Sequence, residues 1–494
     1  MAQKLGGTAI EAFWAGTSFL LTSTVFQPIT GSLSTIFGRK PLIYITLFLF
    51  TVGSIMAGVA NNFTIILIGR CIQGIGGGGV ITCTEVLLTD LVPLRFRGQY
   101  FGFFSMMWAI GTVTGPVIGG AFAQKASWRW IFYFNLFFAG AGFILVPIFL
   151  RLKQVPHSIQ EKLKKVDWIG AFIFIGSVTS ILIPISWGGV MYDWDHAKTV
   201  APLVIGFAGL IAFIAYEYYI PAQPMIPLRL FYNRTASANY LGTFIHGIIL
   251  WCFLYYLPLY YQAIKGYSPI MSGVALFPQT FTVAPASVVV GIAITVLGKY
   301  RYFIWVGWVL TILGCGILAL LDLDTTVVEW VFLNLVSGVG TGMLFPSLGY
   351  AIQSSAEPAD VAFSVAMFSF FRAFGQAFGV AIGGVIFQNA LVSKLSEFPA
   401  LKEVAGEYAK DAVALVEVIK HMPKGELRDQ LMWSYSEALK PVWYAMTGFA
   451  AFAGIVSLLT REQNLDVELQ TDQGLKEKKK KKSVPEEEGV REKL

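Results

Sequence analysis

The stretch "RCIQGIGGGGVITCTEVLL", residues 70–88, has two incompatible interpretations, and the choice between them decides the fold. Gly74, Gly76 and Gly79 match G-x-G-x-x-G, the pattern that holds a dinucleotide pyrophosphate at the start of a helix. The same glycines would also let two membrane helices approach closely. No alternating strand precedes the stretch, and no acidic residue follows about 20 positions later, so the dinucleotide interpretation lacks its context.

The distribution of charge along the chain indicates a hydrocarbon solvent. Of 494 residues, 55% are hydrophobic and 13% are charged, whereas soluble domains carry roughly 25% charged residues. Among 36 Lys and Arg, only Arg70 and Arg372 lie within long apolar runs. The four cysteines all lie inside such runs, with no C-x-x-C or Cys/His pairing, so we predict neither disulfides nor a metal site.

Thirteen apolar runs are long enough to cross a bilayer, since a spanning helix needs about 20 mostly apolar residues. The runs are 12–36, 41–60, 64–89, 98–122, 130–150, 168–189, 199–219, 236–262, 270–297, 302–321, 328–352, 361–390 and 441–460. They predict an all-α integral membrane protein, a helical bundle with thirteen transmembrane helices.

The basic residues of the short loops predict the side on which each loop lies. Thirteen Lys and Arg fall in alternate loops beginning with "GRKP" at 38–41, and only four fall in the opposing loops. The positive-inside rule therefore places the first set in the cytoplasm and segment 391–440 outside. Thirteen spans would leave the N-terminus outside, yet "MAQKLGG" is not a signal peptide, so we expect one helix to be missing before residue 1.

The glycines reveal an internal duplication. Seven glycines recur without a gap at an offset of 264 residues: Gly74, Gly76, Gly78, Gly111, Gly115, Gly119 and Gly120 fall on Gly338, Gly340, Gly342, Gly375, Gly379, Gly383 and Gly384. An even number of spans separates the matched helices, so the repeats have the same orientation. Parallel repeats about an axis along the membrane normal characterise one large transporter architecture.

This duplication divides the chain into four parts. Residues 1–150 form an N-terminal transmembrane bundle, and 151–235 hold two inserted linker helices with cytoplasmic loops. Residues 236–460 form a C-terminal bundle that includes the external loop 391–440. Residues 461–494, with "KEKKKKK" at 476–482, are expected to be a disordered polybasic and acidic cytoplasmic tail.

Four local motifs in this order resemble the major facilitator superfamily, and more narrowly the fungal fourteen-helix drug:proton antiporters, the DHA2 group. "GSLSTIFGRK" (31–40) is similar to the family's loop motif, and "RCIQGIGGGG" to the motif of its fourth helix. "GTVTGPVIGG" (111–120) resembles the antiporter signature of the fifth helix, and "WRWIFYFN" (128–135) the entrance to the sixth. The resemblance implies a duplicated bundle that transports by alternating access.

Two departures from the family pattern matter for function. The family's first helix, which usually carries an acidic residue, has no counterpart here, because "GSLSTIFGRK" follows the first span rather than the second. The aspartate of the loop motif is Thr35, so the usual gating latch is in doubt. The resemblance leaves as gating residues Gly31, Gly38, Arg39, Lys40, Arg95 and Arg97.

Two charged residues in the third span are candidates for proton coupling. A permanent charge in hydrocarbon is costly unless it is paired or hydrated, and the resemblance implies a coupling role for Arg70; the alternative is a snorkelling side chain. Glu85 is the only acid well inside a span, and it lies too far along the helix from Arg70 to pair with it. We expect Glu85 to act in the proton path or in a latch with Arg95 or Arg97; a structural role stays open.

The glycine face of the fourth span, which is also the antiporter signature, is expected to let helices pack closely and slide. Its members are Gly111, Gly115, Pro116, Gly119 and Gly120. Gly115→Leu or Pro116→Leu is predicted to abolish transport while expression stays intact.

Residues of the second half are candidates for substrate contact. The aromatic stretch 246–262 suits large, apolar compounds, although many of its rings would belong to an interfacial belt. Arg372 has no counterpart in the first repeat, so it favours contact with an anion or substrate; helix packing is the alternative. The cavity candidates are His246, Trp251, Tyr255, Tyr256, Asn334, Arg372 and Gln376.

These features favour a secondary transporter, not an enzyme, that exports hydrophobic small molecules such as drugs, toxins or fungal secondary metabolites. We expect the proton gradient to drive it, with no cofactor, no metal and no nucleic acid, as a monomer in the cell membrane. A vacuolar carrier of basic amino acids, a siderophore transporter of the same family, and a non-transporting fragment or sensor are the alternatives.

Overall fold

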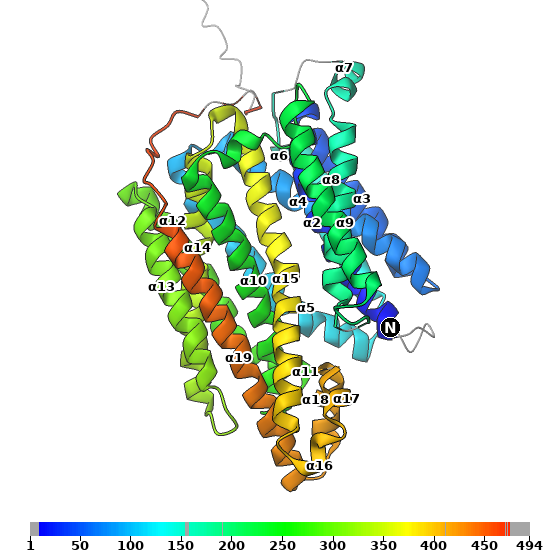
Figure 1. The fold of residues 1–494 in the computed structure, drawn as a ribbon. Helices are drawn as coiled ribbons and strands as arrows, with labels where there is room; N and C mark the ends of the chain where they lie inside the picture. Colours follow the sequence, from blue (N-terminus) through cyan, green and yellow to red (C-terminus); the bar gives the residue numbers. More distant parts are fainter. Residues whose placement is uncertain are drawn as a thin grey trace, which may run out of the picture.

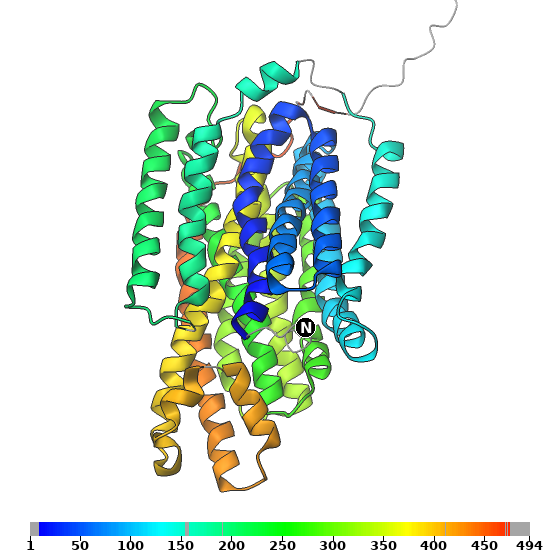
Figure 2. The same ribbon diagram turned by 90° about the vertical axis from the view of Figure 1, so that its right-hand side faces the viewer.

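The computed structural model describes residues 9–153, 158–189, 191–410, 412–469, 471, 473 and 474, and these ranges contain helices but no strand. Long helices run side by side from one end of the molecule to the other (Figures 1 and 2). A helix satisfies all its backbone hydrogen bonds internally, so it is the form that an apolar segment adopts in lipid.

The helices fall into a first half, an inserted pair and a second half. The first half consists of α2 (Ala9–Phe37), α3 (Arg39–Val59), α4 (Phe63–Leu91), α5 (Arg97–Lys125) and α6 (Trp130–Phe149). The short α7 (Ile159–Lys164) leads to the inserted pair, α8 (Trp168–Trp187) and α9 (Ala197–Tyr219). The second half consists of α10 (Arg234–Ala263), α11 (Pro269–Ala275), α12 (Phe277–Leu297), α13 (Arg301–Ile317), α14 (Val327–Ser354), α15 (Val361–Leu395) and α19 (Glu426–Ser457).

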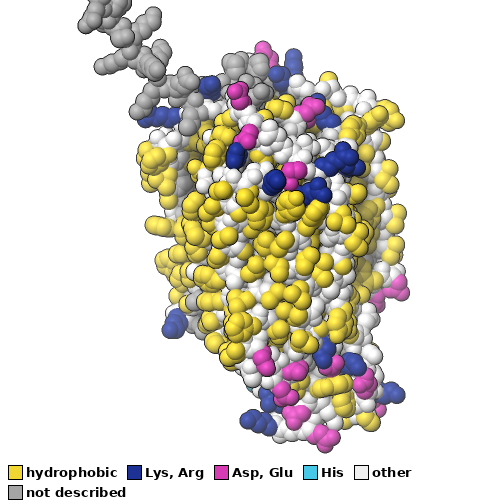
Figure 3. Space-filling view, turned by 90° about the vertical axis from the view of Figure 1, so that its left-hand side faces the viewer, with side chains coloured by type: hydrophobic (Ala, Val, Ile, Leu, Met, Phe, Trp, Pro, Cys, Tyr) yellow, Lys and Arg dark blue, Asp and Glu magenta, His cyan; other side chains and the backbone are white. Residues whose placement is uncertain are grey.

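Eleven segments among the described residues are long and apolar enough to cross a membrane. They account for eleven of the thirteen predicted spans. The other two, α2 and α5, are 29-residue helices that fall outside this set. Figure 3 shows apolar side chains over the middle of the molecule and charged side chains gathered towards its two ends. The chain is therefore an integral membrane protein, while the count of thirteen spans stays a prediction.

The two ends of the bundle differ. One end, which we call the tail face, carries α7 and residues 461–469 and lies at the top of Figure 1. The opposite face carries α16 (Pro399–Lys402), α17 (Ala405–Lys410) and α18 (Ala412–His421). The predicted loop 391–440 is thus largely helical, and α19 begins at Glu426, well before the predicted start of the last span at 441.

The glycines of the opening stretch pack α4 against two neighbours. A Cβ at Gly74 or Gly78 would overlap the main chain of α2, and one at Gly76 would overlap the main chain of α3. In the second half, Gly338 and Gly342 meet α12 in the same way, and Gly340 meets α13. The helix-packing interpretation of "RCIQGIGGGG" is therefore confirmed, and so is the duplication at an offset of 264.

Candidate functional site

A buried ion pair joins the two halves near the tail-face end of α4. Glu85 of α4 accepts a hydrogen bond from the Arg372 guanidinium of α15 at 3.3 Å, and a second from the Ser369 hydroxyl. The side chain of Glu85 is 4% exposed and that of Arg372 is 15% exposed. The Arg372 guanidinium also lies over the rings of Phe345 and Phe368, 4.5 and 5.3 Å from their centres.

This pairing corrects one prediction and refines another. Glu85 does not pair with Arg95 or Arg97, because both arginines lie beyond the end of α4 and bond to other groups. The anion that Arg372 contacts is Glu85 itself. As predicted, Glu85 does not pair with Arg70, which lies on the same helix nearer the opposite face.

Arg70 ties three helices of the first half together. Its Nε donates to the carbonyl oxygen of Ala15 on α2 at 2.7 Å, and its Nη1 donates to Gln73 at 2.6 Å. Gln73 in turn donates to the Ser54 hydroxyl of α3 at 2.8 Å. The guanidinium lies 4.5 Å from the ring centre of Phe19. The side chain is therefore held inside the half by directed bonds.

We expect Arg70→Lys to destabilise the first half although it keeps the charge, because an ammonium cannot reach the Ala15 carbonyl and Gln73 in the same fork geometry. The expected loss is about 1.5–3 kcal/mol of unfolding free energy for a hydrogen bond to a charged group. Thermal unfolding of the purified protein in detergent measures it. Arg129→Lys is the control, since its guanidinium makes one described side-chain hydrogen bond, to the Ala60 carbonyl, and otherwise lies over the Trp128 ring. Equal losses would contradict the assignment.

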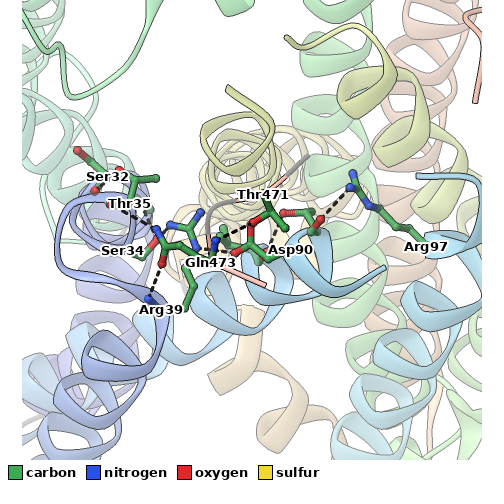
Figure 4. A network of polar contacts seen from close by, with 11 residues as sticks. Ser32, Ser34, Thr35, Arg39, Asp90, Arg97, Thr471 and Gln473 are labelled. Carbon is green, nitrogen blue, oxygen red and sulfur yellow. Dashed lines mark hydrogen bonds and ion pairs between the residues drawn. The ribbon is translucent and has the colours of Figure 1, made fainter. Parts of the chain in front are cut away.

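The predicted gating loop between α2 and α3 forms a polar network at the tail face (Figure 4). Gly38 turns the chain with φ 100°, a conformation that favours glycine. Arg39 pairs with Asp90 at the end of α4 at 2.7 Å and also donates to Ser34. The Thr35 hydroxyl, at the family's aspartate position, donates to the Ser32 carbonyl. Asp90 therefore supplies the carboxylate to Arg39.

Hydropathy alone does not single out Asp90, because the predicted span ends at residue 89. The helix continues to Leu91, so Asp90 is part of it and is 8% exposed. An acid in the last turn of an apolar helix, opposite an arginine at the start of the preceding one, is the signal that would have found it.

Asp90→Ala should cost about 3 kcal/mol of unfolding free energy, because removing one partner of a buried pair leaves Arg39 as an uncompensated charge. Asp466→Ala is the matched control: its pair with Arg95 joins side chains that are 63% and 33% exposed, and exposed pairs contribute about 0–1 kcal/mol. Thermal unfolding followed by tryptophan fluorescence compares the two variants. Similar losses for both would show that burial does not decide the energy of the Asp90 pair.

The other gating residues mostly contact the second half. Arg97 donates to Gln353 of α14 at 2.9 Å, and Arg95 donates to the Thr295 carbonyl of α12 at 2.9 Å. The Tyr350 hydroxyl accepts from the amide of Gly98 and donates to the Arg95 carbonyl, both at 2.7 Å.

Two further gating residues lie on either side of the α2–α3 turn. Gly31 approaches Ala366 of α15 so closely that a Cβ would overlap it. Lys40 stays within the first half and donates to the Leu150 carbonyl. The described hydrogen bonds between the helices of the two halves all involve first-half residues 85–98, so these bonds join the halves towards the tail face.

The glycine face of α5 differs from its repeat. On α15, a Cβ at Gly375 or Gly379 would overlap the main chain of α10, and one at Gly383 would overlap the Tyr256 ring. On α5, a Cβ at Gly111, Gly115 or Gly119 meets no atom of the described chain within 4 Å. The predicted close packing is therefore absent here, because the described first half has no helix in the place of α10. The missing-helix interpretation stays a prediction.

The predicted cavity residues are distributed unevenly. Three are buried in helix contacts of the second half: His246 bonds to the Thr341 carbonyl at 3.0 Å, Tyr256 to the Val380 carbonyl at 2.9 Å, and Asn334 to the Tyr261 hydroxyl at 2.7 Å. Trp251 and Gln376 are half-buried, and Tyr255 is exposed. His246, Tyr256 and Asn334 therefore hold helices of the second half together.

A pocket of about 480 Å³ lies apart from these residues, on the tail face between α2, α9 and α15. Arg229, on its wall, pairs with Asp360, and hydrogen bonding to that carboxylate raises the pKa of the Arg229 guanidinium above its usual value. None of the predicted substrate residues lines this pocket.

Two repeats of parallel orientation, with a buried charge pair between them, define a duplicated membrane transporter. The Major Facilitator Superfamily model matches residues 1–232 and 240–392, and the chain belongs to that family. It is 55% identical over 487 residues to the "MFS transporter L2" of Phoma sp., covering 99% of this chain and 81% of the relative. It is 41% identical over 485 residues to the "Efflux pump FUS6" of Gibberella moniliformis, covering 97% and 86%.

Solved structures agree with the fold. The human organic anion transporter MFSD10 (TETRAN) superposes with a TM-score of 0.57 at 14% identity, covering 92% of this chain and 87% of the other. The relatives are transporters and efflux pumps rather than enzymes. The fourteen-helix subgroup remains a prediction.

Proposed function

We propose that this protein exports hydrophobic small molecules, such as fungal secondary metabolites, in exchange for protons by alternating access. The observation that carries the proposal is the buried Glu85–Arg372 pair, the one place described where a membrane-embedded acid of one half meets a cation of the other. Intramembrane charges are costly and typically mark ion pathways.

The pair suggests how a proton could drive the cycle. Protonation of Glu85 removes its charge, so its attraction to Arg372 is lost and the halves are free to separate at the tail face. Deprotonation restores the carboxylate and draws the halves together again. If the proton enters from the opposite face and leaves at the tail face, one cycle moves a proton and a substrate in opposite directions.

The orientation of the protein in the membrane and the class of its substrate are supported by different observations. The basic loops favour a cytoplasmic tail face, which makes outward export the productive direction across a cell membrane. The name of one relative favours metabolites: the chain is 38% identical over 470 residues to the "Acurin A biosynthesis cluster MFS-type transporter" of Aspergillus aculeatus. The aromatic composition of residues 246–262 favours large apolar compounds over sugars.

Efflux from a host that lacks its own pumps tests the proposal. Cells that express the protein should retain less of a fluorescent hydrophobic substrate than cells that carry an empty vector, and a proton uncoupler should remove the difference. Export that persists after uncoupling, with ATP held constant, would contradict proton coupling. Equal retention across a panel of hydrophobic compounds, with the protein shown to be folded in the membrane, would contradict the substrate class.

A further inference from the structure

The chain after α19 crosses the tail face from the second half to the first. Residues 461–469, 471, 473 and 474, which we call the strap, leave the end of α19 and extend to the α2–α3 turn, as the red trace across the top of Figure 1 shows. The described strap residues form no helix, so their position depends on side-chain and main-chain contacts at the two ends and on the exposed Asp466–Arg95 pair between them.

The second-half end of the strap is firmly anchored. Tyr300, which is fully buried, donates from its hydroxyl to the Arg461 carbonyl at 2.8 Å and accepts from the Gln463 amide at 3.1 Å. Burial raises the pKa of Tyr300 to about 12, so the hydroxyl keeps its proton at neutral pH. Leu465, 2% exposed, belongs to the main hydrophobic core, most of whose residues come from the second half.

The described residues at the first-half end are held by hydrogen bonds. The Thr471 hydroxyl donates to Asp90 at 2.9 Å, and the Gln473 side chain accepts from the Arg39 amide at 3.0 Å and donates to the Thr35 carbonyl at 3.3 Å (Figure 4). The Gly474 carbonyl accepts from the Lys153 amide at 3.0 Å. No large apolar side chain is buried among these described contacts.

The strap therefore reaches the gating network itself. Asp90 divides its two carboxylate oxygens between Arg39 and Thr471, and Gln473 binds the main chain on both sides of the turn. A separation of the halves at the tail face would stretch the strap. The second-half end adds a buried aromatic ring and a buried leucine to its hydrogen bonds, whereas the described first-half contacts are hydrogen bonds without such an apolar anchor. The first-half end is therefore the one to release.

We propose that the strap is a releasable lock that stabilises the closed tail face, and that Thr471 and Gln473 must leave the gating network before that face opens. This inference rests on the alternating access of the proposed function. It assigns a regulatory role to the segment that follows the last transmembrane helix: any change that weakens the Thr471 and Gln473 contacts shifts the protein towards the open tail face.

Two substitutions test the lock, and both change residues of the strap and leave the helices of the two halves unaltered. Thr471→Glu places a carboxylate against the carboxylate of Asp90, and Gln473→Ala removes two hydrogen bonds. Glu468→Gln, at an exposed strap position, is the matched control. Spin labels at cysteines replacing Arg151 and Lys299, exposed residues at the tail-face ends of the two halves, report the distance between the halves by pulsed electron resonance of the full chain. The four native cysteines are replaced by alanine in every sample.

We expect the ratio of long to short distances to rise about tenfold in Thr471→Glu, which corresponds to about 1.4 kcal/mol, and by a smaller factor in Gln473→Ala. Glu468→Gln should match the wild type. If both strap variants keep the wild-type distances while acid and neutral buffers still change them, the lock is wrong and alternating access stands. A single distance in every variant and every buffer would contradict the lock and alternating access together.

Discussion

Glu85→Gln should abolish transport driven by a proton gradient. Glutamine keeps the shape of the side chain and can still accept from Ser369 and Arg372, but it neither carries a charge nor exchanges a proton. Loss of the only carboxylate in this contact removes the difference between protonated and deprotonated states on which coupling depends. Uptake of a fluorescent substrate into inverted vesicles, before and after an imposed pH gradient, measures the effect; we expect the gradient-driven component to disappear.

A matched variant separates coupling from folding. Glu403→Gln removes an exposed carboxylate on the opposite face and should leave the gradient-driven rate unchanged. The Glu85→Arg, Arg372→Glu double variant restores opposite charges across the interface, so it should recover folded protein relative to Glu85→Arg alone. Full gradient-driven transport by Glu85→Gln would show that the proton binds elsewhere and that the pair is only structural.

Gly379→Leu should greatly reduce the yield of folded protein and Gly115→Leu should not, although they change equivalent positions of the two repeats. At Gly379 any side chain would overlap the Ile248 carbonyl of α10, whereas at Gly115 a Cβ has no described neighbour within 4 Å. Overpacking a well-packed contact costs about 1–3 kcal/mol and occasionally more, and here a whole leucine side chain would meet main-chain atoms, so Gly379→Leu should lose most of its folded protein. Gly115→Leu should keep the wild-type yield.

Size-exclusion chromatography of a fluorescent-protein fusion in detergent compares the two yields directly. Gly379→Ala, with its smaller side chain, is expected to fall between Gly379→Leu and the wild type. If Gly115→Leu lost as much folded protein as Gly379→Leu, a helix would have to cover the α5 glycine face in the folded protein.

The helices could be predicted because lipid leaves a sequence few choices. Each apolar run of adequate length becomes a helix, and the glycine offset of 264 exposes the duplication before any contact is known. Arg70 and Glu85 were recognised as unusual for the same reason, since a charge within an apolar run needs a physical explanation. The helices, the duplication and these two charged positions can therefore all be predicted from the sequence alone.

The partners of those charges could not be predicted. Glu85 and Arg372 are 287 residues apart and lie on helices of different halves, and no local pattern records which faces of α4 and α15 meet. Asp90 lies one residue beyond the predicted span 64–89, so hydropathy does not place it in the helix. The polar composition of residues 461–494 predicts a disordered tail. Composition does not reveal the contacts of the strap, because these depend on the shape of the tail face.

The glycine packing of α4 has a mechanical consequence. Gly74, Gly76 and Gly78 bring α4 into backbone contact with α2 and α3 over the same few turns, which leaves little room for bending. The 29 residues of α4 form a rod of roughly 43 Å at 1.5 Å per residue. Its ends carry Arg70 and Glu85. Under the proposed coupling, loss of the Glu85–Arg372 contact near one end of this helix would be transmitted along its whole length, because α4 is held to α2 and α3 and moves with them as one body.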